Sequence, residues 1–413
     1  MKVLLIGSGG REHALATGLS ADKSVTELHV APGNPGIKEI AVLHSISISD
    51  NQAIVDLAKS LAVDLVVIGP EMPLVNGVAD VLRAQGIAVF GPSKAAAQLE
   101  GSKHFAKGVM RDAGVPTAKS FTCENQKEIE RALDTFGAPY VVKDDGLAAG
   151  KGVVVTEDRE IALQHALSCK RVVIEEYLKG PEISLFGISD GKNILPMQPA
   201  QDFKRAYDHD EGPNTGGMGA YSPLPWAPTN IVEDTYTQVL APMIAEMAAR
   251  GTPFVGLLYA GLAVTDRGIR VIEFNARFAD PETQVLIPRL RTPLGQLLYK
   301  AATGNLIDST LQWSDDSAVT VVLAANGYPA DVKSGDEISN LNAVNGVTIF
   351  HAGTKDDGGL KSAGGRVLTV TGVGSDLTEA RDKAYRTVSQ IKLAGSFYRN
   401  DIALNASVAE KGN

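Results

Sequence analysis

The feature that most constrains this fold is the alternation of short apolar runs with helical stretches over the first hundred residues. The apolar runs span residues 3–6, 28–30, 65–68 and 87–90. Such runs between helices are typical of parallel strands that are covered on both faces. We therefore predict that residues 1–100 form an amino-terminal parallel α/β domain.

A glycine turn, Gly7-Ser-Gly-Gly-Arg11, follows the first apolar run. It does not match the dinucleotide-binding pattern, because Glu12 stands where the third glycine is required and no acidic residue ends the second strand. A glycine turn that enters a helix still presents backbone N–H groups to an anion, and Arg11 adds a charge suited to phosphate. We predict a substrate-phosphate site at Gly10 and Arg11. The alternative is a tight turn with a structural role only.

A second glycine-rich segment, residues 144–152, lies between the apolar runs 140–143 and 153–156. Its spacing is not that of a Walker A loop, and strands rather than a strand and a helix flank it. We predict a flap between two antiparallel strands that closes over phosphates with its backbone N–H groups. Lys143, which leads into the flap, would reach the same phosphates. A solvated hairpin turn is the alternative.

The apolar run that starts at residue 172 ends in an acidic pair, Glu175 and Glu176. A charge at a buried strand edge costs free energy unless a ligand or partner satisfies it. The amino group of a purine and the hydroxyls of a ribose would do so. We therefore predict a nucleotide-base site at this strand end.

Glu273 and Asn275 lie two residues apart in a run that continues to Arg277. Side chains two apart on a strand point to the same face, so a carboxylate and an amide oxygen can bind one hard cation. Arg277 would add a planar cation for a transferring phosphoryl group. We predict a Mg²⁺ site against the phosphates of a nucleotide. The alternative is a strand end with ordinary charged residues.

Composition excludes several classes of protein. A chain of 413 residues predicts about two to four domains. The net charge of −9 argues against a nucleic-acid binder, and two cysteines give neither a disulfide framework nor a zinc site. The chain contains no run of about 18 apolar residues, as a membrane span requires. We expect a cytoplasmic protein with no nucleic-acid or membrane partner, and a monomer as the default.

Several segments together resemble one known superfamily. They are Lys143, the flap, residues 175–178, Glu182 and residues 273–275. In this order they resemble the ATP-grasp superfamily of carboxylate–amine ligases. Longer segments are similar to signatures of the phosphoribosylamine–glycine ligases, also called glycinamide ribonucleotide synthetases, and the resemblance spans essentially the whole chain. These segments are residues 7–15, 31–36, 202–205, 212–223 and 275–284.

The resemblance implies an ATP-dependent ligase that joins glycine to 5-phosphoribosylamine through glycyl phosphate, an early step of purine synthesis. ATP and Mg²⁺ or Mn²⁺ are the implied cofactors. The implied catalytic residues are Arg277, Lys143 and Asp280, and the implied metal ligands are Glu273 and Asn275. The implied nucleotide-binding residues are Lys103, Lys143, Gly150, Lys151, Gly152, Glu175, Glu176, Tyr177, Leu178 and Glu182. The implied substrate-binding residues are Gly10, Arg11, Asn34, Asp202, Lys204 and Asp280.

The resemblance also implies a division of the chain into an amino-terminal α/β domain, an ATP-grasp core of two α+β subdomains and a small carboxy-terminal domain. We place the larger ATP-grasp subdomain at residues 101–120 and 188–320, and the flap subdomain at residues 121–187. The carboxy-terminal domain then covers residues 321–413, with strands at 318–324, 347–351 and 366–370 and a helix at 377–391. We expect the tail after residue 400 to be loosely ordered.

Three residues depart from the family pattern: Asp144 for alanine, Phe203 for histidine and Ala279 for glycine. We expect Asp144 to place a carboxylate beside Lys143, and the other two to be small packing changes. Two alternatives stay open. One is another ATP-grasp enzyme, such as a biotin carboxylase or a formate-dependent purine ligase. The other is a nucleotide-binding regulatory protein that has lost turnover.

Overall fold

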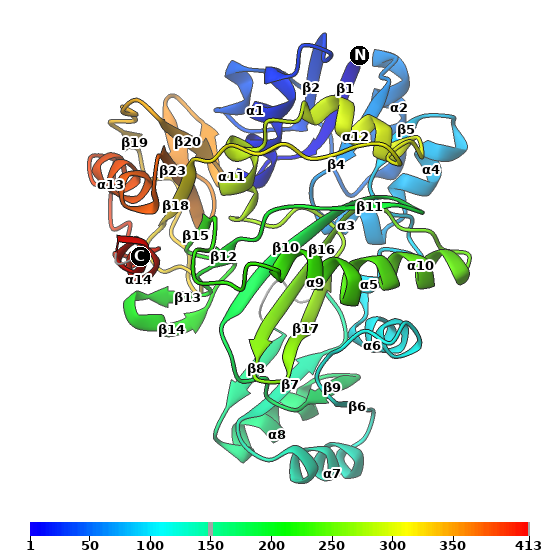
Figure 1. The fold of residues 1–413 in the computed structure, drawn as a ribbon. Coiled ribbons are helices and arrows are strands. Elements are labelled where there is room, and N and C mark those ends of the chain that lie inside the picture. Colours follow the sequence, from blue (N-terminus) through cyan, green and yellow to red (C-terminus); the bar gives the residue numbers. More distant parts are fainter. Residues whose placement is uncertain (148–151, 412–413) are drawn as a thin grey trace.

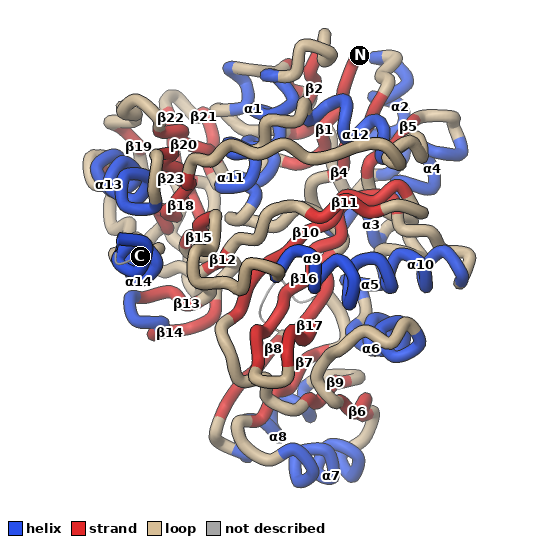
Figure 2. The backbone as a smooth tube through the Cα atoms, viewed as in Figure 1, coloured by secondary structure: helices blue, strands red, loops and turns tan. Residues whose placement is uncertain are grey.

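The computed structural model describes residues 1–147 and 152–411. It is a mixed α/β molecule with a parallel sheet at the amino-terminal end, as the sequence predicts, and three antiparallel sheets of four or five strands (Figure 1). The amino-terminal and carboxy-terminal parts lie side by side at one end, and a smaller lobe lies at the other (Figures 1 and 2).

The amino-terminal sheet has the strand order β3-β2-β1-β4-β5, and all of its strands are parallel. Every residue of β4 is buried, which explains its uninterrupted apolar sequence. The elements of this part are β1 Lys2–Gly7, α1 Gly10–Ala21, β2 Glu27–Pro32, β3 Val42–Leu43, α2 Asn51–Leu61, β4 Leu65–Ile68, α3 Glu71–Val75, α4 Val78–Ala84 and β5 Ala88–Phe90.

A four-stranded antiparallel sheet of order β11-β10-β16-β17 runs through the middle of the molecule. Helix α12 contacts both β10 and β5, so it lies between this sheet and the amino-terminal one. The main elements are α5 Gln98–Gly101, α6 Lys103–Asp112, β10 Glu182–Asp190, β11 Ile194–Pro196, α9 Ile231–Thr235, α10 Ala241–Ala249, β16 Val255–Thr265, β17 Gly268–Asn275, α11 Thr283–Leu286 and α12 Leu294–Ala302.

The small lobe holds a second antiparallel sheet of order β6-β9-β7-β8 with two helices packed on it. Asn125 and Asp158 cap the amino-terminal ends of these helices through their side chains. Strands β7 and β8 pair antiparallel, with Lys143 opposite Val153, as predicted for the two sides of the flap. The elements are β6 Ser120–Cys123, α7 Gln126–Phe136, β7 Tyr140–Asp144, β8 Val153–Thr156, α8 Arg159–Ser168 and β9 Val172–Glu175.

The carboxy-terminal sheet has the order β12-β15-β18-β23-β20. Two of its five strands therefore come from residues 201–222, far earlier in the chain. The elements are β12 Gln201–Asp202, β13 Arg205–Tyr207, β14 Glu211–Asn214, β15 Gly219–Ser222, β18 Ser317–Ala324, β19 Ile338–Ser339, β20 Val347–His351, β21 Thr354–Asp356, β22 Leu360–Ser362, β23 Arg366–Gly374, α13 Leu377–Val388, β24 Lys392–Leu393 and α14 Leu404–Lys411. The predicted domain boundaries stay a prediction.

The expectation of a loosely ordered tail after residue 400 is wrong. Helix α14 forms there, and Ile402, Ala403 and Ala406 are buried in the main hydrophobic core. The Glu410 carboxylate accepts a hydrogen bond from the backbone N–H of Leu377 at 2.8 Å. Apolar burial and this long-range contact hold the tail against α13.

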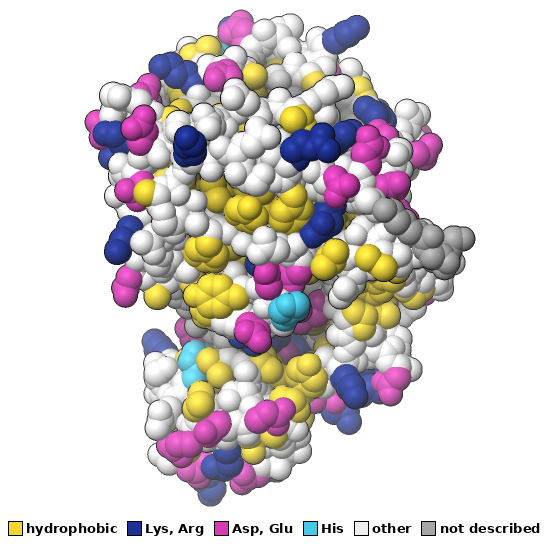
Figure 3. Space-filling view, turned by 90° about the vertical axis from the view of Figure 1, so that its left-hand side faces the viewer, with side chains coloured by type: hydrophobic (Ala, Val, Ile, Leu, Met, Phe, Trp, Pro, Cys, Tyr) yellow, Lys and Arg dark blue, Asp and Glu magenta, His cyan; other side chains and the backbone are white. Residues whose placement is uncertain are grey.

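One face of the molecule carries hydrophobic side chains gathered across its middle, with charges of both signs spread around them (Figure 3). Among the described residues, no helix has the length and apolar character to cross a membrane.

Candidate active site

The predicted metal ligands lie on β17, beside a buried carboxylate that the sequence did not single out. Glu100, at the end of α5, accepts a hydrogen bond from the backbone N–H of Ala276 at 2.8 Å. The Asn275 side chain fits best when its amide nitrogen donates to Glu100 Oε1 at 3.3 Å. In that orientation its oxygen is turned away from the Glu100 carboxylate.

Arg277 follows these ligands and is held between two acidic residues. Its Nη2 lies 3.0 Å from Glu100 Oε1, and its Nε lies 3.5 Å from Glu71 Oε2. Burial works against the charge of Arg277, but Glu100 and Glu71 outweigh it and raise its pKa. Burial also raises the pKa of Glu100, although Arg277 opposes this. The guanidinium is therefore fixed in place and permanently charged.

Lys143 reaches from the small lobe across to β17. Its Nζ donates to the backbone carbonyl of Ile272 at 2.8 Å, next to Glu273, and lies 2.9 Å from Glu175 Oε2. Lys107, on α6, lies 2.9 Å from the other oxygen of Glu175. Burial lowers the pKa of Lys107, whereas in Glu175 the two lysines outweigh burial and lower the pKa. The Glu175 side chain thus binds two lysines in this structure.

The base of the predicted flap is anchored to α6. Asp145 accepts hydrogen bonds from Ser102 Oγ and from the backbone N–H of His104, both at 3.0 Å. Lys103 Nζ donates to the carbonyl of Gly146 at 3.1 Å, and the Gly152 carbonyl accepts from the Asp144 N–H at 2.7 Å. Lys103 and Gly152 therefore lie at the flap.

Two residues predicted to bind the nucleotide from the flap, Gly150 and Lys151, lie outside the described residues. The prediction that the flap closes over phosphates stays a prediction.

Asp144 does not face Lys143, contrary to our expectation. Successive residues of a strand point to opposite faces, and Asp144 lies against Cys169. Burial and this carboxylate together raise the pKa of the Cys169 thiol.

The strand end after Glu175 turns outward. Glu176 accepts from the backbone N–H of Lys119 at 3.0 Å and from Arg267 at 3.3 Å. Tyr177 is exposed, and Leu178 ends the segment half-buried. The position predicted for a nucleotide base at this strand end stays a prediction.

Glu182, Lys204 and Asp202 form one cluster at the edge of β10. Lys204 Nζ lies 2.7 Å from Glu182 Oε2 and 3.2 Å from Asp202 Oδ1. Burial acts to lower the pKa of Lys204. The carboxylates of Asp202 and Glu182 act to raise it and help to outweigh burial, so the pKa is raised. The structure thus brings together one residue predicted for the nucleotide and two predicted for the substrates.

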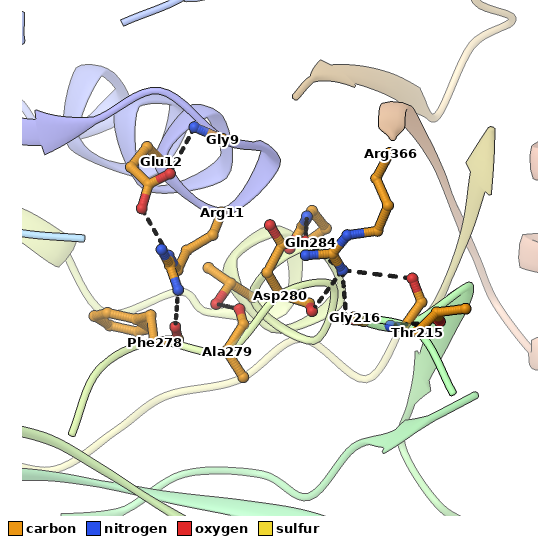
Figure 4. Close-up of polar contacts among 12 residues, drawn as sticks. Gly9, Arg11, Glu12, Thr215, Gly216, Phe278, Ala279, Asp280, Gln284 and Arg366 are labelled. Atoms are coloured by element: carbon orange, nitrogen blue, oxygen red, sulfur yellow. Dashed lines mark hydrogen bonds and ion pairs between the residues drawn. The ribbon is translucent and has the colours of Figure 1, made fainter. Parts of the chain in front are cut away.

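Arg11 is directed away from the glycine turn. Its Nε lies 2.6 Å from Glu12 Oε1, and its Nη1 donates to the Phe278 carbonyl at 3.0 Å (Figure 4). Glu12 also accepts from the Gly9 N–H at 2.7 Å and fills the turn, because a Cβ on Gly7 would lie 2.4 Å from its Cγ. Glu12 therefore occupies the glycine turn, in agreement with the absence of the dinucleotide pattern.

Asn34 and Gly10 lie where the amino-terminal and carboxy-terminal parts meet. The Asn34 amide donates to the carbonyls of Ser8 and His351 at 2.8 and 2.9 Å, and its oxygen accepts from Ile37 N at 3.0 Å. Its side chain is thus engaged in holding two parts of the chain together. A Cβ on Gly10 would lie 2.7 Å from Gln284 Nε2, so only glycine fits there without displacing a neighbour.

Asp280 lies on the loop before α11, next to the glycine turn (Figure 4). Its Oδ1 accepts from Gln284 Nε2 at 2.8 Å and lies 3.4 Å from Arg366 Nη1. Burial disfavours the charge of Asp280, but Arg366 and Arg11 outweigh it and lower its pKa. The carboxylate therefore stays ionised and is suited to bind an ammonium group.

Sequence reasoning missed four residues that this geometry brings to the site. They are Glu71, Glu100, Lys107 and Arg366. Lys107 had a local signal, since it lies one helical turn from Lys103 on the same face of α6. The other three reach their partners only through contacts between distant parts of the chain.

The residues present fit a nucleotide and a divalent cation. Mg²⁺ commonly takes one or two protein oxygens and completes its shell with phosphate and water. Glu273 and Asn275 supply such a pair, and the described residues contain no cluster of three or more His, Cys, Asp or Glu that could hold a metal. Lys103, Lys107 and Lys143 lie around the same place as candidate phosphate partners.

Comparisons with known proteins agree with this geometry. Three phosphoribosylglycinamide synthetase models match the chain: the N domain at residues 1–100, the ATP-grasp (A) domain at 101–283 and the C domain at 318–405. A Streptomyces coelicolor protein named phosphoribosylamine–glycine ligase is 61% identical over 99% of this chain and 100% of its own length.

Solved structures show the same likeness. The crystal structure of a phosphoribosylamine–glycine ligase from Thermotoga maritima has a TM-score of 0.85 and 33% identity, covering 98% of this chain and 100% of that one. A biotin carboxylase from Campylobacter jejuni has a TM-score of 0.75 at 16% identity, covering 99% and 98%, and so shares the fold alone. The chain therefore belongs to the phosphoribosylglycinamide synthetase family, whose central part is an ATP-grasp domain.

Proposed function

We propose that this chain joins glycine to 5-phosphoribosylamine at the expense of ATP, giving glycinamide ribonucleotide, ADP and phosphate. Its family membership over the full length of its relatives supports this proposal. The structural observation that carries it is the contact of Lys143 with the Ile272 carbonyl at 2.8 Å. This contact brings a candidate phosphate partner from one lobe beside Glu273, a candidate metal ligand on the other.

The proposed reaction has two steps. A glycine carboxylate oxygen attacks the terminal phosphorus of ATP, and ADP leaves, so that a poor electrophile becomes glycyl phosphate. The amine of phosphoribosylamine then attacks the glycyl carbonyl carbon, a C–N bond forms, and the C–O bond to phosphate breaks. Such chemistry depends mainly on positioning and on neutralising charge.

The nucleotide half of the site is assigned on this basis. Glu273 and Asn275 would hold Mg²⁺ or Mn²⁺, which neutralises phosphate charge when bound. Lys103, Lys143 and the flap residues Gly150, Lys151 and Gly152 would contact phosphate oxygens. The segment from Glu175 to Leu178, with Glu182, would bind the adenosine.

The remaining residues are assigned to the transferring phosphoryl group and to the two substrates that are joined. Arg277, fixed by Glu71 and Glu100, would stabilise the transferring phosphoryl group. Asp280 would bind the glycine ammonium, since Arg366 and Arg11 keep it ionised. Asp202 and Lys204 would lie near the junction of the substrates, and Gly10, Arg11 and Asn34 near the phosphoribosyl group.

A test of the function is ADP release with Mg-ATP, glycine and phosphoribosylamine generated in the cuvette, each omitted in turn. Wild-type turnover should require all three. Glu273→Gln should lower kcat by at least about 100-fold, because a charged ligand of the cation is lost. Glu246→Gln, which changes a half-buried carboxylate of α10 paired with Arg250, is the matched control. Turnover without phosphoribosylamine, or with bicarbonate or formate in place of glycine, would overturn the proposal.

We further propose that the protein works as a cytoplasmic monomer. The chain has only two cysteines, Cys123 and Cys169, too few for a disulfide framework, which fits a reducing compartment. Light scattering coupled to gel filtration would test the oligomeric state, and a dimer mass at micromolar concentration would contradict it.

A further inference from the structure

Glu282 is a buried carboxylate that the roles assigned above leave unused. It stands immediately before α11, two residues after Asp280, and only 3% of its surface is exposed. Ser184 on β10 is its one side-chain hydrogen-bond partner among residues 1–147 and 152–411, with Oγ 2.9 Å from Glu282 Oε1. A buried carboxylate with a single neutral partner is costly unless it has a task or a ligand.

A row of polar groups connects Glu282 to the predicted metal ligands. Ser184 Oγ lies 3.1 Å from Tyr259 Oη. Tyr259 Oη in turn lies over Gly261, where an added Cβ would be 3.3 Å from it and 3.4 Å from Glu273 Cγ. Two hydroxyl groups, those of Ser184 and Tyr259, therefore lie between Glu282 and Glu273.

Several charged or titratable groups surround Glu282, and three of them have roles assigned above. Asp202 and Lys204 face it from β12 and the residues after it, Arg277 faces it from the loop after β17, and Tyr259 faces it from β16. Burial and the nearby Asp202 carboxylate raise the pKa of Glu282 to about 7. By contrast, the pKa of Asp280 is lowered and that of Lys204 is raised. Near neutral pH, Glu282 is therefore the carboxyl of this cluster that is suited to exchange a proton.

The second step of the proposed reaction releases a proton. An amine that attacks a carbonyl carbon becomes a positively charged nitrogen in the adduct, and it must lose a proton before a stable amide can form. A base with a pKa near the working pH accelerates such a transfer most effectively.

We propose that Glu282 is the base that takes this proton from the phosphoribosylamine nitrogen. The C–N bond forms, the proton passes from nitrogen to a Glu282 carboxylate oxygen, and the C–O bond to phosphate breaks with its electron pair leaving on phosphate. Proton loss to water then restores the carboxylate. This inference rests on the proposed function, because it assigns a residue to the second step of that reaction.

The test separates the two steps with hydroxylamine, whose weakly basic nitrogen intercepts glycyl phosphate and loses its proton to water. Glu282→Gln keeps the shape of the side chain and an oxygen that can accept from Ser184. It should retain glycine hydroxamate formation within about threefold of wild type and lose at least about 100-fold in kcat with phosphoribosylamine. If Glu282→Gln lost both activities equally, Glu282 would be a structural or glycine-binding residue and the inference would be wrong.

A pH profile gives a second, independent readout. A base must be deprotonated, so the wild-type kcat should fall as pH decreases through about 7. Glu282→Gln should lose this acidic limb of the pH profile, so that its kcat no longer changes over this range. Glu282→Asp, which keeps a carboxylate one methylene shorter, should recover part of the activity together with the limb. An unchanged limb in Glu282→Gln would overturn the inference. If wild type released no ADP with Mg-ATP, glycine and phosphoribosylamine together, the proposed function itself would fail, so the two failures are distinguishable.

Discussion

Arg366 Nη1 donates to the backbone carbonyl of Asp280 at 2.8 Å, and the same guanidinium also binds the carbonyl of Gly216 (Figure 4). One residue of β23 therefore holds two loops that come from the middle of the chain. The carboxy-terminal sheet in this way determines the position of a carboxylate assigned to glycine.

Replacing Arg366 should weaken substrate binding more than ATP binding. We expect Arg366→Met to raise the KM for glycine by about tenfold or more and to lower the free energy of unfolding by about 2–3 kcal/mol, since charged hydrogen bonds are lost. The KM for ATP should change little. Arg381→Met is the matched control, because Arg381 also donates to backbone carbonyls, those of Ile402 and Asn400, but away from the site. Equal changes in both KM values would contradict the expectation.

The lysine pair on Glu175 gives a prediction about stability. Lys107→Met would leave a buried carboxylate with one ionic partner instead of two, and we expect a loss of about 3–5 kcal/mol in the free energy of unfolding. Adding Glu175→Gln should restore part of that loss, because the neutral amide no longer needs two cations. Urea denaturation of the single and double variants measures the coupling. Strictly additive effects would show that the three charges do not act together.

The contact between His13 and His351 predicts a loss of stability in mild acid. His13 Nδ1 accepts the backbone N–H of His351 at 2.8 Å, and burial lowers the pKa of His13 to about 3 and that of His351 to about 4. In the unfolded chain both histidines have their ordinary pKa near 6.5. Above that pH they are neutral in both states and do not affect stability. Below it the unfolded chain takes up protons that the folded chain does not, so the free energy of unfolding falls. We expect up to about 2 kcal/mol less stability per histidine at pH 5 than at pH 7.

Urea midpoints between pH 8 and pH 5 would measure this effect. His13→Asn keeps an acceptor for the His351 N–H but cannot take up a proton, so the variant should show a smaller fall across this range than wild type. An identical fall in both proteins would assign the effect to other groups.

The contacts around Phe203 predict that replacing it lowers stability and leaves kcat nearly unchanged. The Arg399 guanidinium lies 4.9 Å from the Phe203 ring centre and binds both carboxylate oxygens of Asp401. Phe203→His, which introduces the residue that the family resemblance predicts at this position, should cost about 1 kcal/mol of stability through a weaker cation–π contact. Phe203→Leu should behave similarly, and kcat should stay within about twofold in both. A large change in kcat would show that position 203 contacts a substrate.

The strands were largely predictable because their signal is local. The run at 65–68 matches β4 residue for residue, and that at 153–156 matches β8. The helix predicted at 377–391 begins at the same residue as α13, since Asp376 caps its start, and ends three residues earlier. The tail was not predictable in this way, because α14 is held by burial against distant residues rather than by its own periodicity.

The candidate site was predictable where its residues are close in sequence and not where partners meet across the fold. Glu273, Asn275 and Arg277 share one strand and its continuation, so their proximity follows from strand geometry. The pairing of Arg277 with Glu71 depends on packing between two parts of the molecule and has no local signal. The direction of the Arg11 side chain likewise depends on Glu12 and on the distant carbonyl of Phe278.

The sheet that unites β12 and β15 with β18, β23 and β20 has a consequence for evolution and for engineering. The carboxy-terminal residues lack two of their strands when they are separated from residues 201–222. They are therefore not a module that recombination could exchange by a single crossover. A chimera between two relatives should fold well only when both segments come from the same parent, so these distant stretches are expected to be inherited together.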